Sequence, residues 1–207
     1  FFGCSSLKEI ILPESVYATG RFTFAHCISI TRIKLPDSLM YIGEASFIDC
    51  ISLEEIEFPP KLKYIDHRAF EGCKKLKKIH LPNSIQCLGE YVFDGCISLE
   101  EATYSDPFDV KIVPVGFFNN CSSLIKFDLS SFDTICESSF RGCSSLSNIK
   151  LPDNLKLIEE NAFRDCKSLI EIDIPRHLIS INESAFMNCC LLKKINFSTN
   201  LMSSIDD

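Results

Sequence analysis

Cysteine is the residue type in this chain best suited to chemistry, because thiols can form disulfides, bind soft metals or act as nucleophiles. Nine of the twelve cysteines return every 22 to 25 residues: Cys4, Cys27, Cys50, Cys73, Cys96, Cys121, Cys143, Cys166 and Cys189. The chain has no Cys-x-x-Cys pair of the kind that holds zinc, and nine equivalent thiols offer no unique disulfide pairing. We therefore predict a core column of buried thiols from Cys27 to Cys166, with disulfides between neighbouring repeats as the alternative.

Side chains suited to acid–base chemistry do not form a recognisable site. The four histidines occupy different positions in different repeats: His26, His67, His80 and His177. Paired acids such as Glu54 and Glu55 have basic residues in the adjacent repeat. These cations disfavour the raised carboxyl pKa that a general acid needs. The glycines form no phosphate-binding loop. The sequence therefore predicts no enzyme activity, no cofactor and no metal site.

The elements that position these side chains follow from a repeat of about 23 residues. A phenylalanine stands three residues before each of the nine cysteines, and a leucine or isoleucine three residues after. Further along the unit, Ile33 and Leu35 alternate with polar Arg32 and Lys34, which is the period of a strand with one buried face. Pro36 then ends the strand. A fixed period of this length predicts a solenoid whose equivalent strands run parallel.

The repeat runs from one end of the chain to the other, so we predict a single array over residues 1–207. Neither end reads as a polar capping repeat. We therefore expect a fragment of a longer protein, with contacts to further repeats of the same chain at both ends.

Charged residues fill the position five residues after each repeat cysteine, and their sign alternates. This predicted charge ladder comprises Glu9, Arg32, Glu55, Lys78, Glu101, Lys126, Glu171 and Lys194, with Asn148 as its one interruption. Parallel strands bring equivalent positions side by side, so each charge would lie between two opposite charges. The structural interpretation is a row of ion pairs, and the functional interpretation is a docking surface for a charged partner.

The repeat is irregular over residues 96–142, where the cysteine spacing becomes 25 and then 22 residues. An insertion at residues 106–116 replaces the usual turn, and insertions in repeat arrays map to loops, often on the binding side. Drift of a redundant repeat is the alternative. The candidate partner-binding residues are Tyr104, Asp106, Phe108, Ile125, Lys126, Asp128 and Ile170.

Composition narrows the classes of partner. The formal net charge is −7, which argues against a nucleic-acid binder, because such proteins carry a basic stripe. No apolar run approaches the roughly 18 residues of a membrane-spanning helix. The expected partner is therefore a protein of unknown identity.

The unit Ile30-x-x-Ile33-x-Leu35-Pro36, followed by Ile42-Gly43 and Phe47-x-x-Cys50, resembles the BspA-like leucine-rich repeat. The resemblance covers essentially the whole chain. It implies a curved right-handed leucine-rich-repeat solenoid with a parallel concave sheet of about nine short strands. Turns and single helical turns would lie on its convex side. It also implies a surface or secreted protein that binds partners or mediates adhesion. An intracellular scaffold or regulatory protein is the alternative, because the cysteines lack evident pairing; the localisation stays open.

Overall fold

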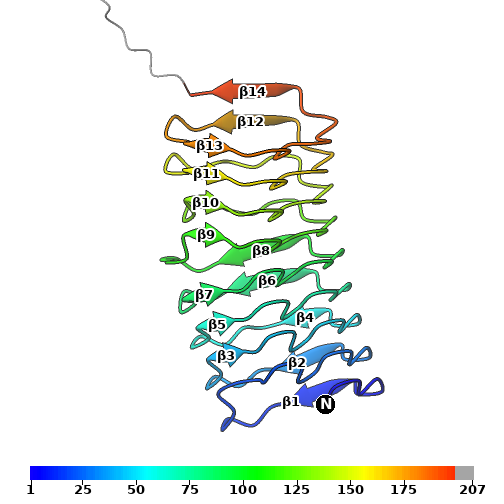
Figure 1. The fold of residues 1–207 in the computed structure, drawn as a ribbon. Helices are drawn as coiled ribbons and strands as arrows, with labels where there is room; N and C mark the ends of the chain where they lie inside the picture. The colour runs from blue at the N-terminus through cyan, green and yellow to red at the C-terminus, as the bar shows by residue number, and fades with distance from the viewer. Residues whose placement is uncertain (199–207) are drawn as a thin grey trace, which may run out of the picture.

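The computed structural model describes residues 1–198 as a stack of similar coils in one solenoid (Figure 1). The predicted end of the array at residues 199–207 lies outside the described residues. Each regular coil contains two short strands and a turn segment. One series of strands forms what we call the first face: β1 (Glu9–Ile11), β2 (Arg32–Lys34), β4 (Glu55–Ile56), β6 (Lys78–Leu81), β8 (Glu101–Tyr104), β12 (Glu171–Ile174) and β14 (Lys194–Phe197).

The first face corresponds to the parallel sheet predicted from the repeat. Two of the repeats, however, contribute no strand to it. Its hydrogen-bonded groups are β1-β2-β4, β6-β8 and β12-β14, all parallel. Lys126 contributes only an isolated bridge to Glu101, and residues 146–152 form no strand. Asn148, which is a poor strand former, stands at the position where the other repeats begin their strands.

A second series of strands, which the sequence analysis did not predict, forms the second face. It comprises β3 (Tyr41–Ile42), β5 (Tyr64–Ile65), β7 (Cys87–Leu88), β9 (Ile112–Val113), β10 (Thr134–Ile135), β11 (Leu157–Ile158) and β13 (Ser180–Ile181). These strands form two parallel groups, β3-β5-β7 and β9-β10-β11-β13. The second residue of most of these pairs is buried, and the first faces outward.

The third side of each coil, which we call the turn side, is a six-residue segment before each cysteine, such as residues 44–49. No described residue is helical, so the expected single helical turns are replaced here by turns. The reason is that two residues per segment, such as Ala45 and Asp49, have positive φ, which interrupts right-handed helical geometry. The N–H groups of Phe22, Phe24 and His26 donate to carbonyls of the next coil at 2.8 to 2.9 Å.

A column of phenylalanine rings fills the core behind the turn side. Consecutive rings are 5.1 to 5.9 Å apart and stack face to face at every step except the tilted pair Phe118–Phe140. Phe24, Phe47, Phe70 and the next four members are at most 1% exposed. Stacked rings of this kind contribute about 0.5–1.5 kcal/mol per pair beyond their buried area.

The repeat cysteines stand beside this column, and those from Cys27 to Cys166 are fully buried. All twelve cysteines of the chain are free thiols in this structure. From Cys27 to Cys189, each repeat thiol donates a hydrogen bond of 3.0 to 3.3 Å to the phenylalanine carbonyl of the preceding coil. A small apolar side chain with a weak donor fits this position, because it satisfies a buried carbonyl as well as filling space.

Candidate functional site

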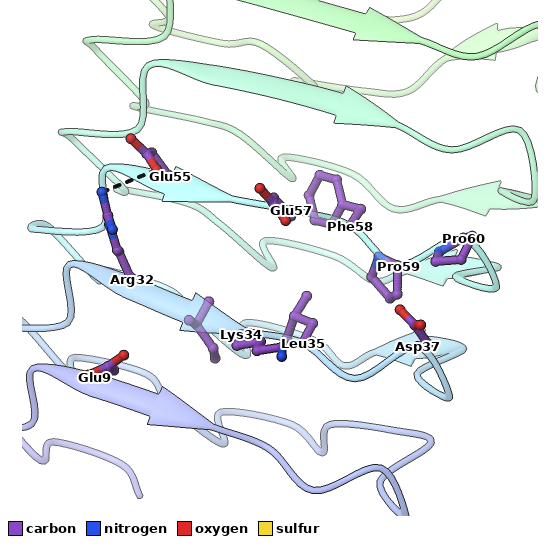
Figure 2. Close-up of a pocket in the computed structure, with 11 residues that line it drawn as sticks. Glu9, Arg32, Lys34, Leu35, Asp37, Glu55, Glu57, Phe58, Pro59 and Pro60 are labelled. Atoms are coloured by element: carbon purple, nitrogen blue, oxygen red, sulfur yellow. Dashed lines mark ion pairs between the residues drawn. The ribbon is translucent and has the colours of Figure 1, made fainter.

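The charge ladder lies along the first face, and its regular part is visible in Figure 2. The strand register pairs Glu9 with Arg32 and Arg32 with Glu55. Arg32 Nη2 lies 3.7 Å from Glu55 Oε2. Around this pair the first face is hollowed into a pocket of about 430 Å³, which Lys34 and Glu57 also line. Of the charged residues that line this pocket, only Arg32 and Glu55 form an ion pair in the described part of the chain.

Glu101 is the ladder member with the most complete pairing. Its two carboxylate oxygens lie 3.2 Å from Lys78 Nζ and 3.4 Å from Lys126 Nζ. Hydrogen bonds from Lys78 and then Lys126 lower the pKa of the Glu101 carboxyl. By contrast, Glu55 and Lys78 form no ion pair in the described part of the chain, and their strands β4 and β6 are not paired. The register also pairs Glu171 with Lys194, although the two charges are not in ion-pair contact.

Beyond Lys126 the ladder stops, and a pocket of about 340 Å³ opens on the first face. Four of the predicted partner-binding residues line it together: Tyr104, Asp106, Lys126 and Asp128. Ala102, Thr103, Phe127 and Lys150 complete the lining. The missing strand at residues 146–152 lies in the next coil, which supplies Lys150. Sequence reasoning did not include Lys150 in the site, although it stands at the same repeat position as Asp128.

Of the four charged residues that line this pocket, only Lys126 forms an ion pair among residues 1–198, and its partner is Glu101. Asp128 accepts hydrogen bonds of 2.9 Å from the backbone N–H and the hydroxyl of Ser130, not from a cation. The pocket therefore offers the carboxylate of Asp106 and the ammonium group of Lys150 without an ion-pair partner within 4.0 Å in the described residues.

Phe108 is buried, in contrast to its predicted role as a partner-binding residue. Its side chain is 2% exposed, and its ring lies 4.6 Å from that of Tyr104 and 6.0 Å from that of Phe132. Phe108 stands twelve residues after Cys96, and Leu39 and Leu62, at the same distance from their repeat cysteines, are also buried. Tyr104 belongs to the same aromatic cluster, and its hydroxyl lies 3.1 Å from Ser130 Oγ. We therefore omit Phe108 from the candidate contact residues.

The two predicted isoleucines are exposed. Ile125 is 54% exposed and precedes Lys126 at the pocket, while Ile170 is 48% exposed and precedes β12. Neither lines the pocket, but Ile125 extends its apolar rim. In the same region His80 is hydrogen-bonded at both ring nitrogens, to Thr103 and Ser105 at 2.8 Å.

A further signal in the sequence was missed. The residue before each repeat cysteine has positive φ and is mostly glycine, asparagine or aspartate: Gly3, Asp49, Gly72, Gly95, Asn120, Gly142, Asp165 and Asn188. These are the residue types that tolerate the left-handed region. Their recurrence at one position could have predicted left-handed turns in place of helical ones.

Comparisons with known proteins bear on this architecture. The model of the BspA type leucine rich repeat region matches in six copies over residues 1–125 and 111–207. A search of curated proteins finds no matching sequence. No helix in the described residues is long and apolar enough to span a membrane.

Several solved structures share the fold. The T. pallidum leucine rich repeat protein TpLRR is 27% identical, with a TM-score of 0.58 over 89% of this chain and 78% of that chain. The pneumococcal vaccine antigen PcpA is 20% identical, with a TM-score of 0.59 over 94% of this chain and 63% of that chain. A leucine-rich repeat protein from Eubacterium ventriosum is 20% identical, with a TM-score of 0.58 over 97% of this chain and 45% of that chain. The family match covers the whole array, and this chain belongs to the BspA-type leucine-rich repeat family.

Proposed function

We propose that this chain is a non-enzymatic protein-interaction module. Its contact surface is the first-face pocket lined by Tyr104, Asp106, Lys126, Asp128 and Lys150. The observation that carries the proposal is the break in strand pairing at Lys126, where four of the predicted contact residues line one pocket. Of the charged residues in this pocket, only Lys126 forms an ion pair among residues 1–198. Unpaired charges around a partly apolar pocket are available to a partner of complementary charge.

One of the similar structures is described as a vaccine antigen, which favours an extracellular role in adhesion or partner binding. The twelve cysteines form no disulfide in this structure, which suits the alternative, an intracellular scaffold, because disulfides are rare in reducing compartments. Labelling intact cells with a membrane-impermeant amine reagent separates the two. Labelling of this protein supports the surface role, and labelling only after lysis supports the intracellular one.

The contact surface is tested by a matched pair of variants. Lys150 and Lys34 stand at the same repeat position on the same face, but Lys150 lines the irregular pocket and Lys34 lines the pocket around Arg32 and Glu55. A photo-crosslinking residue at Ile125 in the native host identifies the partner, which is then purified. We expect Lys150→Glu to weaken its binding at least about tenfold and Lys34→Glu to leave it nearly unchanged. Equal effects of the two variants, or none, would contradict the proposed surface.

A further inference from the structure

The second face has one interruption, where a proline accounts for one of the missing hydrogen bonds. In five coils a backbone N–H at the end of the strand donates to a carbonyl of the preceding coil, at 2.8 to 3.0 Å. These donors are Asp66, Gly89, Cys136, Glu159 and Asn182. Pro114 stands at the equivalent position, directly after β9, and has no N–H to donate to the preceding coil. Among the described second-face strands, β7 and β9 are the only consecutive pair that is not hydrogen-bonded.

The Leu88 carbonyl loses its partner through this interruption. In the other coils the equivalent carbonyls of Ile42, Ile65 and Val113 each accept a backbone N–H. In the described chain, the Leu88 oxygen receives only a 3.9 Å contact from the Cys87 thiol, which is a weak donor. The carbonyl therefore keeps most of its capacity to accept a hydrogen bond.

A pocket of about 340 Å³ lies at the interruption. Its walls include the rings of Tyr41 and Tyr64, the apolar side chains of Ile112 and Val115, and the carboxylates of Asp66 and Glu90. The two tyrosine rings lie 6.3 Å apart and are tilted by 49°. No lysine or arginine lines this pocket. The space is of the size that holds a side chain or small ligand.

The polar groups around the pocket mostly accept hydrogen bonds. The Tyr41 hydroxyl donates to Asp66 Oδ2, and the Tyr64 hydroxyl donates to Gln86 Oε1 at 2.7 Å. His67 Nδ1 accepts the N–H of Glu90 at 3.1 Å. Both hydroxyl protons are thus used internally. Asp66 Oδ1 also accepts the backbone N–H of His67 at 2.8 Å, and His67 Nε2 lies 3.8 Å from the same oxygen. Further acceptor capacity remains at the two carboxylates and at the Leu88 carbonyl.

We propose that this second-face pocket binds the guanidinium group of an arginine side chain presented by a partner protein. A guanidinium group carries five donors and a permanent positive charge, which complement the pocket's acceptors. Its planar face stacks on aromatic rings, and Tyr64 is 40% exposed at the pocket. An ammonium group lacks this planar stacking and spreads its donors less widely, so lysine fits less well. The pocket lies on a different face from the site proposed above, and the two proposals stand independently.

The test uses three short capped peptides that differ only in the central residue: glycine-arginine-glycine, glycine-lysine-glycine and glycine-citrulline-glycine. Citrulline has nearly the shape of arginine without its charge. Each is titrated into the ¹⁵N-labelled protein while amide shifts are recorded by NMR. We expect the arginine peptide to shift the amides of Gly89, Glu90 and Val115, with weaker binding of the lysine peptide and none of the citrulline peptide. Equal shifts from citrulline and arginine would overturn the proposal.

Two variants sharpen the result. Glu90→Gln removes one carboxylate at the pocket and should weaken the arginine peptide roughly threefold to fivefold, the effect of one exposed charge pair. Glu137→Gln, at the same repeat position two coils further on and outside the pocket, is the control and should not change the affinity for the arginine peptide.

Pro114→Ala supplies the missing N–H, which should pair with the Leu88 carbonyl, close the pocket and abolish binding. Circular dichroism and a thermal melt check that this variant folds. Undiminished binding to either Glu90→Gln or folded Pro114→Ala would refute the site.

Discussion

The turn side and the strand faces respond differently to the insertion at residues 106–116. On the turn side nothing is interrupted: the N–H groups of Tyr91, Phe93 and Gly95 donate to the next coil at 2.9 to 3.1 Å across the irregular repeat. The thiol bonds of Cys121 and Cys143 also continue, at 3.1 and 3.2 Å. Both strand faces, however, lose pairing in this region. The turn side therefore holds the array together, and the strand faces are free to vary.

The difference has a physical cause. The turn side combines stacked rings, buried thiols and left-handed residues at fixed positions, so an extra residue there would displace all three from register. The strand faces need only one buried side chain per short strand, such as Ile65 or Val113, and tolerate a break between coils. Extra residues are thus accommodated where the structure is least constrained, and both proposed binding sites lie there.

The largest expected effect comes from alkaline pH, which acts on the turn side. Burial raises the pKa of the Cys50 thiol to about 12, and raises those of Cys73 and Cys121 well above their usual value. Because the folded values lie above the unfolded one, the thiols stabilise the fold fully below about pH 8.5. That stability is lost at about 1.4 kcal/mol per pH unit for each thiol as the pH rises above it. We expect the urea midpoint to fall steeply from about pH 8.5 upwards, towards the folded pKa of about 12 of the Cys50 thiol. A flat midpoint would contradict the thiol column.

Truncating the ring column should have the next largest effect. Phe70 is fully buried and stacks between Phe47 at 5.1 Å and Phe93 at 5.6 Å. We expect Phe70→Ala to lower the free energy of unfolding by about 3–5 kcal/mol, because it removes buried area and leaves a cavity. Tyr64→Ala, on the half-exposed second face, is the matched aromatic truncation and should cost much less. Urea denaturation of both variants measures the difference; similar losses would erase the distinction between the two sides.

A smaller effect is expected from a single thiol. Cys73→Ala removes a fully buried side-chain atom and the 3.3 Å hydrogen bond to the Phe47 carbonyl. We expect a loss of about 1–2 kcal/mol in unfolding free energy. Cys87→Ala, an exposed thiol on the second face, should change stability by no more than about 0.5 kcal/mol. If the two substitutions lowered the free energy of unfolding equally in chemical denaturation, the hydrogen bonds of the buried thiols would contribute nothing to stability.

The smallest effect belongs to the charge ladder. Glu55→Lys would place a third cation beside Arg32 and Lys78 and should reduce stability by about 0.2–1 kcal/mol. Glu14→Lys makes the same charge change at an exposed turn position and serves as the control. Differential scanning calorimetry at low and high salt checks the electrostatic origin, because salt should reduce the difference between the variants. Equal melting temperatures of the two variants at low salt would show that the ladder does not contribute to stability.

Much of the fold could be predicted from the sequence because the repeat constrains it. The positions of Phe47, Cys50 and Ile56 in every unit correctly indicated a solenoid with a parallel sheet and buried thiols. The register of the charged positions followed from the period alone, since Glu9 pairs with Arg32 and Glu171 with Lys194. The family comparison then confirmed the class of repeat.

The remaining features depend on information that the period does not carry. A two-residue strand such as Tyr41–Ile42 is too short to show alternation, so the second face was not predicted. Phe108 is different, because it stands twelve residues after Cys96, as the buried Leu39 stands after Cys27, so the period did carry a signal for its burial that the sequence analysis missed. Lys150 was missed because its place in the pocket depends on a strand that fails to form in its own coil.

The direction of the turn-side hydrogen bonds has a consequence for the history of the array. The N–H of Phe24 donates forward to the coil that follows, and the thiol of Cys50 donates backward to the carbonyl of Phe24. The junctions from Phe24 to Phe163 repeat this exchange, so the two surfaces created by deleting one whole unit among them are complementary to each other. Gene segments encoding single units can therefore be duplicated or lost in one step, because the rejoined coils still match in their hydrogen-bond donors and acceptors.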